Sequence, residues 1–440
     1  MLAWLDFDSD ALDGARTMLR ALQEKRTIDH LAMGKLRDDL ADYFFPATST
    51  IMPHTRYLFM VPKAFEELRL ECRKLRLSSD QAWKQLGLIE AKQGEMLMDL
   101  LRRERKASSL DSSFLTRSGI IGWENLLLSK GEDFVSQTPS NNYWASLRKL
   151  KIFNTKMTRA RFVNVLVNES RRPIARKTVL DEEAEGLVAS HWHKDIATLM
   201  DSTSLDLNYH QANFLRERYG SFDCLFGRLI KDQSTPCGSK KEIDEYTGPW
   251  DYPFIPDQDK VSVEVARKLS ALMKGATLIY GNLVLEEYNL GAHNSFSSWP
   301  SALEEWLDAG KKEISAAAAL KFKSQELLLL MPTTMAKRGD ELAFLNGFQV
   351  LLSKNSGIAD LVLGCRQLFT QWEKRNKPSS HRLGRIWGRS LTEDEKLPYT
   401  EKVLRQSFDV LGVMEFRWQM AAQFLWQIKL GLDEWPSRVK

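Results

Sequence analysis

The sequence predicts a mainly α-helical protein with several domains and at most a minor β component. Apolar residues recur at three- and four-residue spacing through most of the chain, which is the period of an amphipathic helix. Alternating patterns typical of strands are few and short. At 440 residues the chain is also long for a single hydrophobic core, so two or three domains are expected.

Helical patterns follow one another along the chain, each bounded by polar caps, prolines or glycines. The expected helices cover 9–26, 35–45, 64–77, 80–106, 143–153, 159–167, 261–272, 301–320, 339–352, 357–372 and 400–430. The last of these has the clearest pattern, because Trp418, Ala421, Leu425 and Ile428 fall on one face. The short helices near 120–170 predict a module resembling a helix-turn-helix.

The segment from Phe44 to Pro62 is expected to fix how its neighbouring helices meet. It contains Pro46, Pro53 and Pro62, so one continuous helix across it is not expected. The apolar run at 57–61 is too short to span a membrane and suits a buried core segment.

Domain limits are drawn where composition changes. Prolines and glycines are concentrated between residues 232 and 259, which predicts an extended loop or linker. The expected organisation is an N-terminal helical domain at 1–110, a basic helical module at 111–235, a linker at 236–258 and a C-terminal helical domain at 259–440.

Composition indicates a soluble protein of a reducing cytoplasm. The N-terminus carries Asp6 and Asp8 where a secretory signal would be cationic and then apolar. The four cysteines form no CxxC pair, so neither a zinc ribbon nor a disulfide framework is expected. The longest aliphatic run, at 327–331, is too short to cross a bilayer, and no membrane partner is expected.

Two clusters of basic residues are the most informative functional feature. The first spans 148–177, where ten basic residues and the single acid Glu169 give a local charge of +9, against +4 for the whole chain. The second spans 374–389, has six basic residues and no acid, and is expected to be a loop because it contains Pro378, Gly384 and Gly388. The indole of Trp387 adds a stacking surface.

Clustered cations of this kind favour binding to a nucleic acid, most simply DNA, with a salt-dependent affinity. Two alternatives stay open, namely a solvated surface and a contact with an acidic protein. The candidate nucleic-acid-binding residues are Arg148, Lys149, Lys151, Arg159, Arg161, Arg171, Arg172, Arg176, Lys177, Lys374, Arg375, Lys377, Arg382, Arg385 and Arg389.

Patterns that point to catalysis are weak. His191 and His193 flank Trp192 and would share one face of a strand, but no third metal ligand is evident. Glu90 and Lys92 have the spacing of some metal-dependent nucleases, yet they fall in an expected helix and suit a solvated face better. P-loop, GxSxG and HExxH motifs are missing. No catalytic residue, cofactor or metal is therefore assigned.

Several segments resemble a bacterial family of unknown function. They are LAWLDF at 2–7, GKLRDDLADYFF at 34–45, PATSTI at 46–51, TRYLFMVP at 55–62, GIIG at 119–122, Pro139-Ser140 with Tyr143-Trp144, and FRWQMAAQFLWQIKLGL at 416–432. Members of that family typically carry Gly at the position of Ala47 and Trp at that of Lys63. The resemblance implies a bacterial origin, an anti-phage defence neighbourhood containing helicases and nucleases, and no catalytic motif.

The function expected from the sequence is a non-catalytic DNA-binding or scaffolding subunit of a bacterial defence or DNA-processing complex. A helicase or nuclease would be its protein partner. The alternatives are a protein–protein adaptor with no nucleic-acid role and an unrecognised metal-dependent nuclease.

Overall fold

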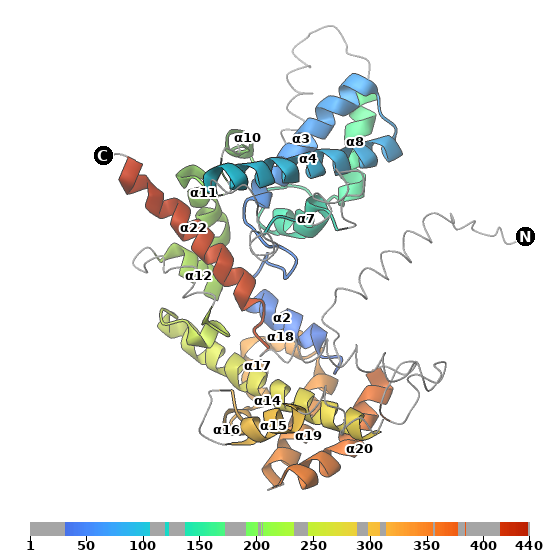
Figure 1. Cartoon of the computed structure of the whole chain (residues 1–440), viewed down its shortest axis with the longest axis vertical. Helices are drawn as coiled ribbons and strands as arrows, with labels where there is room; N and C mark the ends of the chain where they lie inside the picture. The colour runs from blue at the N-terminus through green and yellow to red at the C-terminus, as the bar shows by residue number, and fades with distance from the viewer. Residues whose placement is uncertain are drawn as a thin grey trace, which may run out of the picture. The chain divides into compact units, whose positions relative to one another are not determined.

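The computed structural model describes residues 31–105, 119–122, 137–171, 191–200, 204, 206–232, 245–287, 298–308, 314–354, 357–376, 383 and 414–438. Within these ranges the regular structure is helical, apart from one antiparallel bridge between Phe153 and Trp192 (Figure 1). The mainly α prediction is confirmed. The helix expected at 9–26 lies outside the described residues. No helix in the described ranges has the length and apolar character needed to span a membrane.

The described residues form two units, each assembled from separate stretches of the chain. Unit 1 draws on Met1–Tyr43 and Tyr246–Phe416, and unit 2 draws on Phe44–Glu245 and Arg417–Lys440. The chain therefore passes between units at residues 43–44, 245–246 and 416–417. The domain limits expected from the sequence are consecutive along the chain, and they stay a prediction.

Unit 2 contains two groups of packed helices. In the first, α3 packs against α4, α7 and α8, and in the second α11 packs against α12 and α22. Figure 1 shows α22 running alongside α11 and α12. The helices of this unit are α3 (Tyr57–Leu75), α4 (Ser79–Arg105), α7 (Pro139–Lys149), α8 (Arg159–Arg171), α10 (Ile196–Leu199), α11 (Tyr209–Gly220), α12 (Leu225–Lys231) and α22 (Trp418–Arg438).

Helix α3 begins seven residues earlier than the sequence predicts and passes through Pro62. As expected, no continuous helix crosses 44–62, because the chain is non-helical between the end of α2 at Phe44 and the start of α3 at Tyr57. The expected start at residue 64 was wrong, because the apolar run itself is helical. Tyr57, Leu58, Phe59, Met60 and Val61 are all buried, and this apolar burial offsets the hydrogen bond that a proline cannot donate. The prediction that this run belongs to the core is correct.

The C-terminal helix α22 completes a core that begins near residue 45. Its four predicted inward residues are each at most 2 % exposed, as the three-four spacing requires. The Trp418 ring lies 5.8 Å from that of Phe45, and the Gln427 side-chain oxygen accepts hydrogen bonds from the Thr55 amide at 2.8 Å and hydroxyl at 2.7 Å. Contacts between residues this far apart in sequence explain why the two ends of unit 2 pack together.

Unit 1 is organised around its longest helix, α14 (Asp257–Glu287). Helices α15, α16, α17, α19 and α20 all contact α14. The remaining elements are α2 (Gly34–Phe44, its last residue assigned to unit 2), η1 (Pro249–Asp251), α15 (Ser298–Leu307), α16 (Ala316–Leu320), α17 (Ser324–Leu330), α18 (Pro332–Met335), α19 (Gly339–Lys354) and α20 (Ile358–Asn376). The expected pair at 339–352 and 357–372 corresponds to α19 and α20, whereas 301–320 is divided into two helices.

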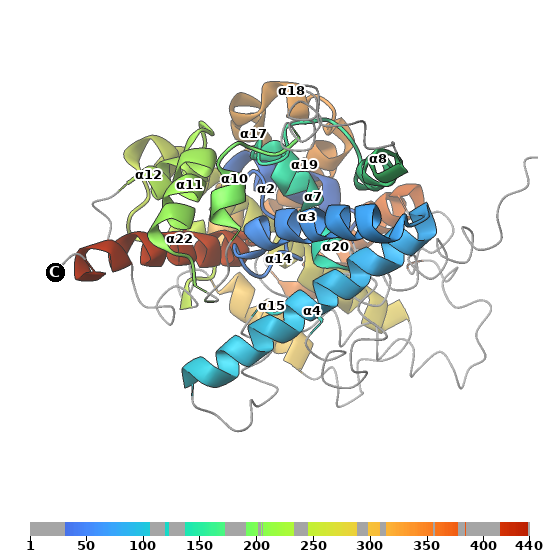
Figure 2. The same cartoon turned by 90° about the horizontal axis from the view of Figure 1, so that it is seen from above.

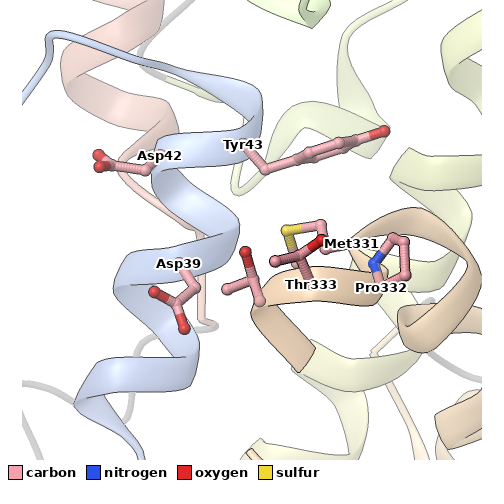
Figure 3. A pocket seen from close by; sticks show the side chains of 7 residues that line it. Asp39, Asp42, Tyr43, Met331, Pro332 and Thr333 are labelled. Atoms are coloured by element: carbon pink, nitrogen blue, oxygen red, sulfur yellow. The ribbon is translucent and has the colours of Figure 1, made fainter. Parts of the chain in front are cut away.

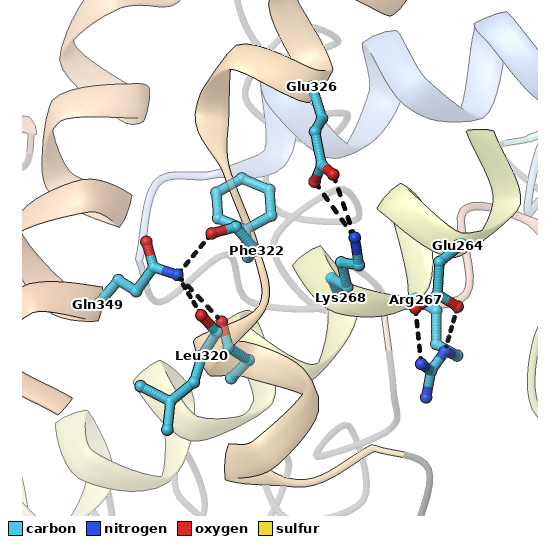
Figure 4. Close-up of polar contacts among 8 residues, drawn as sticks. Glu264, Arg267, Lys268, Leu320, Phe322, Glu326 and Gln349 are labelled. Carbon is cyan, nitrogen blue, oxygen red and sulfur yellow. Dashed lines mark hydrogen bonds and ion pairs between the residues drawn. The ribbon is translucent and has the colours of Figure 1, made fainter. Parts of the chain in front are cut away.

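Polar side chains tie the short helices of unit 1 to its core (Figure 4). The Gln349 side-chain amide donates to the backbone carbonyls of Leu320 at 2.9 Å and Phe322 at 2.5 Å. The Lys268 ammonium pairs with Glu326 at 3.1 Å, which joins α14 to α17. Gln349 of α19 thus satisfies carbonyl groups at the end of α16 and in the turn after it, while Lys268 separately ties α17 to α14.

Candidate nucleic-acid interface

The connection between α7 and α8 is held rigidly by backbone hydrogen bonds. After α7 the chain turns at Lys151, whose φ of 54° is left-handed. The Ile152 and Phe153 amides both donate to the Leu147 carbonyl, at 2.9 and 3.0 Å. The Asn154 amide then donates to the His191 carbonyl at 2.7 Å, next to the Phe153–Trp192 bridge. These hydrogen bonds fix the backbone at residues 152–154, and with it the positions of the neighbouring side chains.

Buried aromatic rings pack against Phe153 in this connection. Phe153 lies 4.5 Å from Trp144, 4.9 Å from Phe162 and 4.9 Å from Trp192, measured between ring centroids. All four side chains are at most 7 % exposed. The rings meet at tilted or edge-on angles, which are the favourable arrangements for aromatic pairs. The basic residues nearby are thus carried on a packed core and not on a free loop.

Four cations surround a hollow of about 440 Å³ at this connection. No acidic residue lines it. Arg148, Lys151 and Lys156 are exposed and have no side-chain partner within the described residues. The lining residues are Ala145, Arg148, Lys149, Lys151, Phe153, Asn154, Thr155 and Lys156. Like charges held this close repel one another, so an anion that enters the hollow relieves the repulsion and gains hydrogen-bond donors.

Arg159 differs from these cations because the protein itself engages its guanidinium. The group donates to the Ser140 hydroxyl at 2.8 Å and the Thr138 hydroxyl at 3.1 Å, and it stacks over the Trp83 ring at 4.9 Å. Burial lowers the pKa of Arg159, and the nearby Glu90 carboxylate opposes that shift. Arg159 therefore holds α7, α8 and α4 together in this structure.

The sequence suggested that Glu90 lies on a solvated face of its helix. In the structure the Glu90 side chain, on α4, is buried against the N-terminal end of α7. It is 1 % exposed and accepts a hydrogen bond from the Ser140 amide at 2.5 Å. A carboxylate at a helix N-terminus is favoured by the helix dipole. Burial nevertheless raises the pKa of Glu90 to about 7, against hydrogen bonds from Ser140 and the charge of Arg159. Lys92 is exposed on another face of α4.

The other candidates of the first cluster lie on or beyond α8. Arg161 and Arg171 are exposed on that helix and have no ion-pair partner within the ranges described. Arg172, Arg176 and Lys177 lie outside the described residues. The connection at 150–158 is longer than the three- to four-residue turn of a helix-turn-helix, so the spacing of α7 and α8 does not match that module.

The second cluster belongs to unit 1, whereas the first belongs to unit 2. Lys374 and Arg375 lie in the last turn of α20, so the expected loop begins later than the sequence suggests. Arg375 pairs with Asp340 at 2.6 Å, and Lys374 is exposed. Lys377, Arg382, Arg385 and Arg389 lie outside the described residues.

The histidine pair supports packing. Trp192 is 3 % exposed within the aromatic group, His191 contacts the Phe153 and Phe162 rings, and His193 contacts Phe214. Burial lowers the pKa of both imidazoles. In the described part of the chain, no three His, Cys, Asp or Glu side chains converge as metal ligands.

A second hollow, in unit 1, has an acidic lining. Figure 3 shows Asp39, Asp42 and Tyr43 of α2 beside the residues that begin α18. Asp39 is already paired with Arg338 at 2.6 Å. An acidic surface with a neutralised carboxylate does not suit a polyanion, so this hollow is not a candidate nucleic-acid site.

Comparisons with known proteins bear on the N-terminal part of the chain. The model of a family of unknown function, DUF6361, matches residues 1–84. No curated protein matches the chain. No solved structure matches it either. The resemblance to a family of unknown function is thereby supported for residues 1–84, and the comparisons assign no activity.

Proposed function

We propose that this protein is a non-catalytic DNA-binding and scaffolding subunit of a bacterial defence or DNA-processing complex. The hollow between α7 and α8 is the observation that carries the proposal. Its lining contains four cations and no acidic residue, which suits the closely spaced phosphates of a nucleic-acid backbone. The rigid backbone beneath them favours binding, because little ordering is required when the ligand arrives.

The side chains in this hollow match phosphate binding better than base recognition. Lysine ammonium groups act as point charges, and Arg148 adds planar donors suited to phosphate oxygens. Asn154 and Thr155 add polar groups to the lining. Contacts of this kind position a nucleic acid without reading its sequence. The hollow is therefore proposed as the phosphate-binding part of the interface.

Salt dependence of binding to a labelled DNA duplex tests the proposal. Four phosphate contacts predict a slope of about −3 to −4 when log affinity is plotted against log salt concentration. The variant Lys151→Gln/Lys156→Gln should lower the magnitude of this slope by about 2. A matched control is Lys92→Gln/Arg103→Gln, which removes two exposed charges of α4 in the same unit. Equal slopes for the two variants would refute the proposed site.

The scaffolding part of the proposal rests on the family resemblance, which implies a neighbourhood of helicases and nucleases. We expect a neighbouring gene product of that type to co-purify with the tagged full-length chain at physiological salt. Nuclease treatment of the lysate should leave the complex intact if the contact is made by protein. Recovery of the chain alone, under conditions where its neighbours are expressed, would contradict a scaffolding role.

A protein–protein adaptor without a nucleic-acid role is the second candidate. Exposed apolar side chains on α17 favour it, because Leu329 is 82 % exposed and Leu328 beside it is 37 % exposed. Such an adaptor would bind its partner and would not bind duplex or single-stranded DNA even at low salt. The salt titration therefore separates the two candidates.

A further inference from the structure

The exposed face of α8 carries side chains of the types that contact bases in protein–DNA complexes. Ala160, Arg161, Asn164, Asn168 and Arg171 are exposed, and the helical period places them on one side. Phe162, Val163, Leu166 and Val167 are buried on the opposite side. Arginine pairs in a bidentate manner with guanine, and asparagine does so with adenine. No acid interrupts this exposed stripe.

The spacing on α8 also suits a recognition helix. Such helices contact bases through side chains at positions i, i+3, i+4 and i+7. Starting from Arg161, these positions are Asn164, Val165 and Asn168. Val165 is half-buried and offers an apolar surface of the kind that contacts a thymine methyl group. A helix of 13 residues is about 20 Å long, which is enough to cross the major groove.

Cations flank this face on two sides. At its N-terminal end, Lys156 of the basic hollow precedes α8 by three residues. On the other side, the Ser79 hydroxyl donates to the Asn164 side-chain oxygen at 2.8 Å, which places the corner between α3 and α4 next to the stripe. Both overall views show α8 beside that corner (Figure 1, Figure 2). Exposed cations at the corner are Arg73, Lys74 and Arg76.

In this arrangement, different residues would contact the phosphates and the base edges of DNA. Cations around the helix contact phosphates and set its position, while the polar stripe faces the base edges. We infer that α8 enters the major groove and that this protein binds duplex DNA with sequence selectivity. The inference rests on the proposed DNA-binding function, because it concerns the same surface.

Selection from a pool of random duplexes tests the inference with the full-length chain. We expect a preferred sequence to be enriched and bound at least about tenfold more tightly than a scrambled duplex of equal length. Arg161→Lys keeps the charge but removes the planar fork, and Asn168→Ala changes no charge. Each should weaken binding to the preferred duplex by about 5- to 100-fold and leave scrambled duplex binding nearly unchanged. The matched control Arg103→Lys should change neither affinity.

The outcomes separate this inference from the function on which it rests. Salt-dependent duplex binding without any enriched sequence would overturn base reading by α8 and leave phosphate binding standing. An enriched sequence whose affinity is unaffected by both α8 variants would assign the reading to another element. Preference for single strands or RNA would overturn the duplex assignment. Absence of all nucleic-acid binding would overturn both proposals.

Equal thermal midpoints of wild type and variants would show that the variants fold.

Discussion

At the scale of single residues, Glu90 and Arg159 show how burial changes the meaning of a charged pattern. Sequence spacing grouped Glu90 with Lys92, and charge clustering grouped Arg159 with the DNA-binding candidates. In the structure each is committed to internal contacts through Ser140 and Thr138. These partners lie far away along the chain, so local periodicity carries no signal for them.

The raised pKa of Glu90 predicts that the protein loses stability as pH rises. Its folded pKa of about 7 lies above the ordinary value of 4.5, so the folded state binds more protons between these values. The associated stabilisation is fully present below about pH 4.5 and is lost as pH rises through 7. Its size is about 3 kcal/mol. Thermal midpoints measured from pH 5 to pH 8 should fall in the wild type and change much less in Glu90→Gln.

The exposed residue Glu95, on the same helix, supplies the control for this pH dependence. Glu95→Gln should reproduce the wild-type fall in thermal midpoint. If Glu90→Gln also reproduces it, the raised pKa of Glu90 is not the cause.

Arg159 is expected to matter for stability more than for DNA binding. Arg159→Ala removes two hydrogen bonds and the stack on Trp83, and it leaves Glu90 without its cation. We expect a loss of about 2 kcal/mol in the free energy of unfolding. The salt slope of DNA binding, measured well below the unfolding transition, should stay close to the wild-type slope. A decrease in slope of about 1, half of that expected for Lys151→Gln/Lys156→Gln, would instead place Arg159 among the phosphate contacts.

At the scale of elements, periodicity and caps identify most of the described helices. The α4, α8, α19 and α20 segments were all located from apolar spacing, because each has one face in a core. The start of α3 was missed because Pro62 is normally a helix breaker, and only the burial of the preceding apolar run overrides it. The sequence also joined α15 and α16 into one expected helix at 301–320, because the alanines at 316–319 favour helix.

Two helical glycines differ in the space around them, so replacing each with alanine should change stability in opposite directions. A Cβ at Gly431 would lie 2.8 Å from the Ala212 Cβ and 2.9 Å from the Leu207 carbonyl oxygen, so Gly431→Ala should cost about 1–3 kcal/mol. At Gly87 on α4, nothing lies within 4 Å of the added Cβ. Gly87→Ala should therefore stabilise the protein by about 0.5–1 kcal/mol. Urea denaturation of both variants checks the contrast, and two changes of the same sign would contradict this packing.

At the scale of the whole molecule, the division into units depends on contacts that no local pattern reveals. Residues near 45 and near 425 share one core, although almost the whole chain separates them. Sequence reasoning found the basic clusters because charge density is local. It did not anticipate that Arg159 would be engaged internally, or that Asn164 and Asn168 would extend the basic surface along α8. Those features depend on which helix faces remain exposed after packing.

If phosphates occupy the hollow between α7 and α8, bound DNA should shield the lysines of that hollow from a small acylating reagent. The full-length chain is pulsed with acetic anhydride in the presence and absence of a DNA duplex, and modified peptides are quantified by mass spectrometry. DNA should protect Lys151 and Lys156 from acetylation, while the exposed Lys92 on α4 stays reactive. Unchanged modification of Lys151 and Lys156 at a DNA concentration that saturates binding would contradict phosphate binding in the hollow.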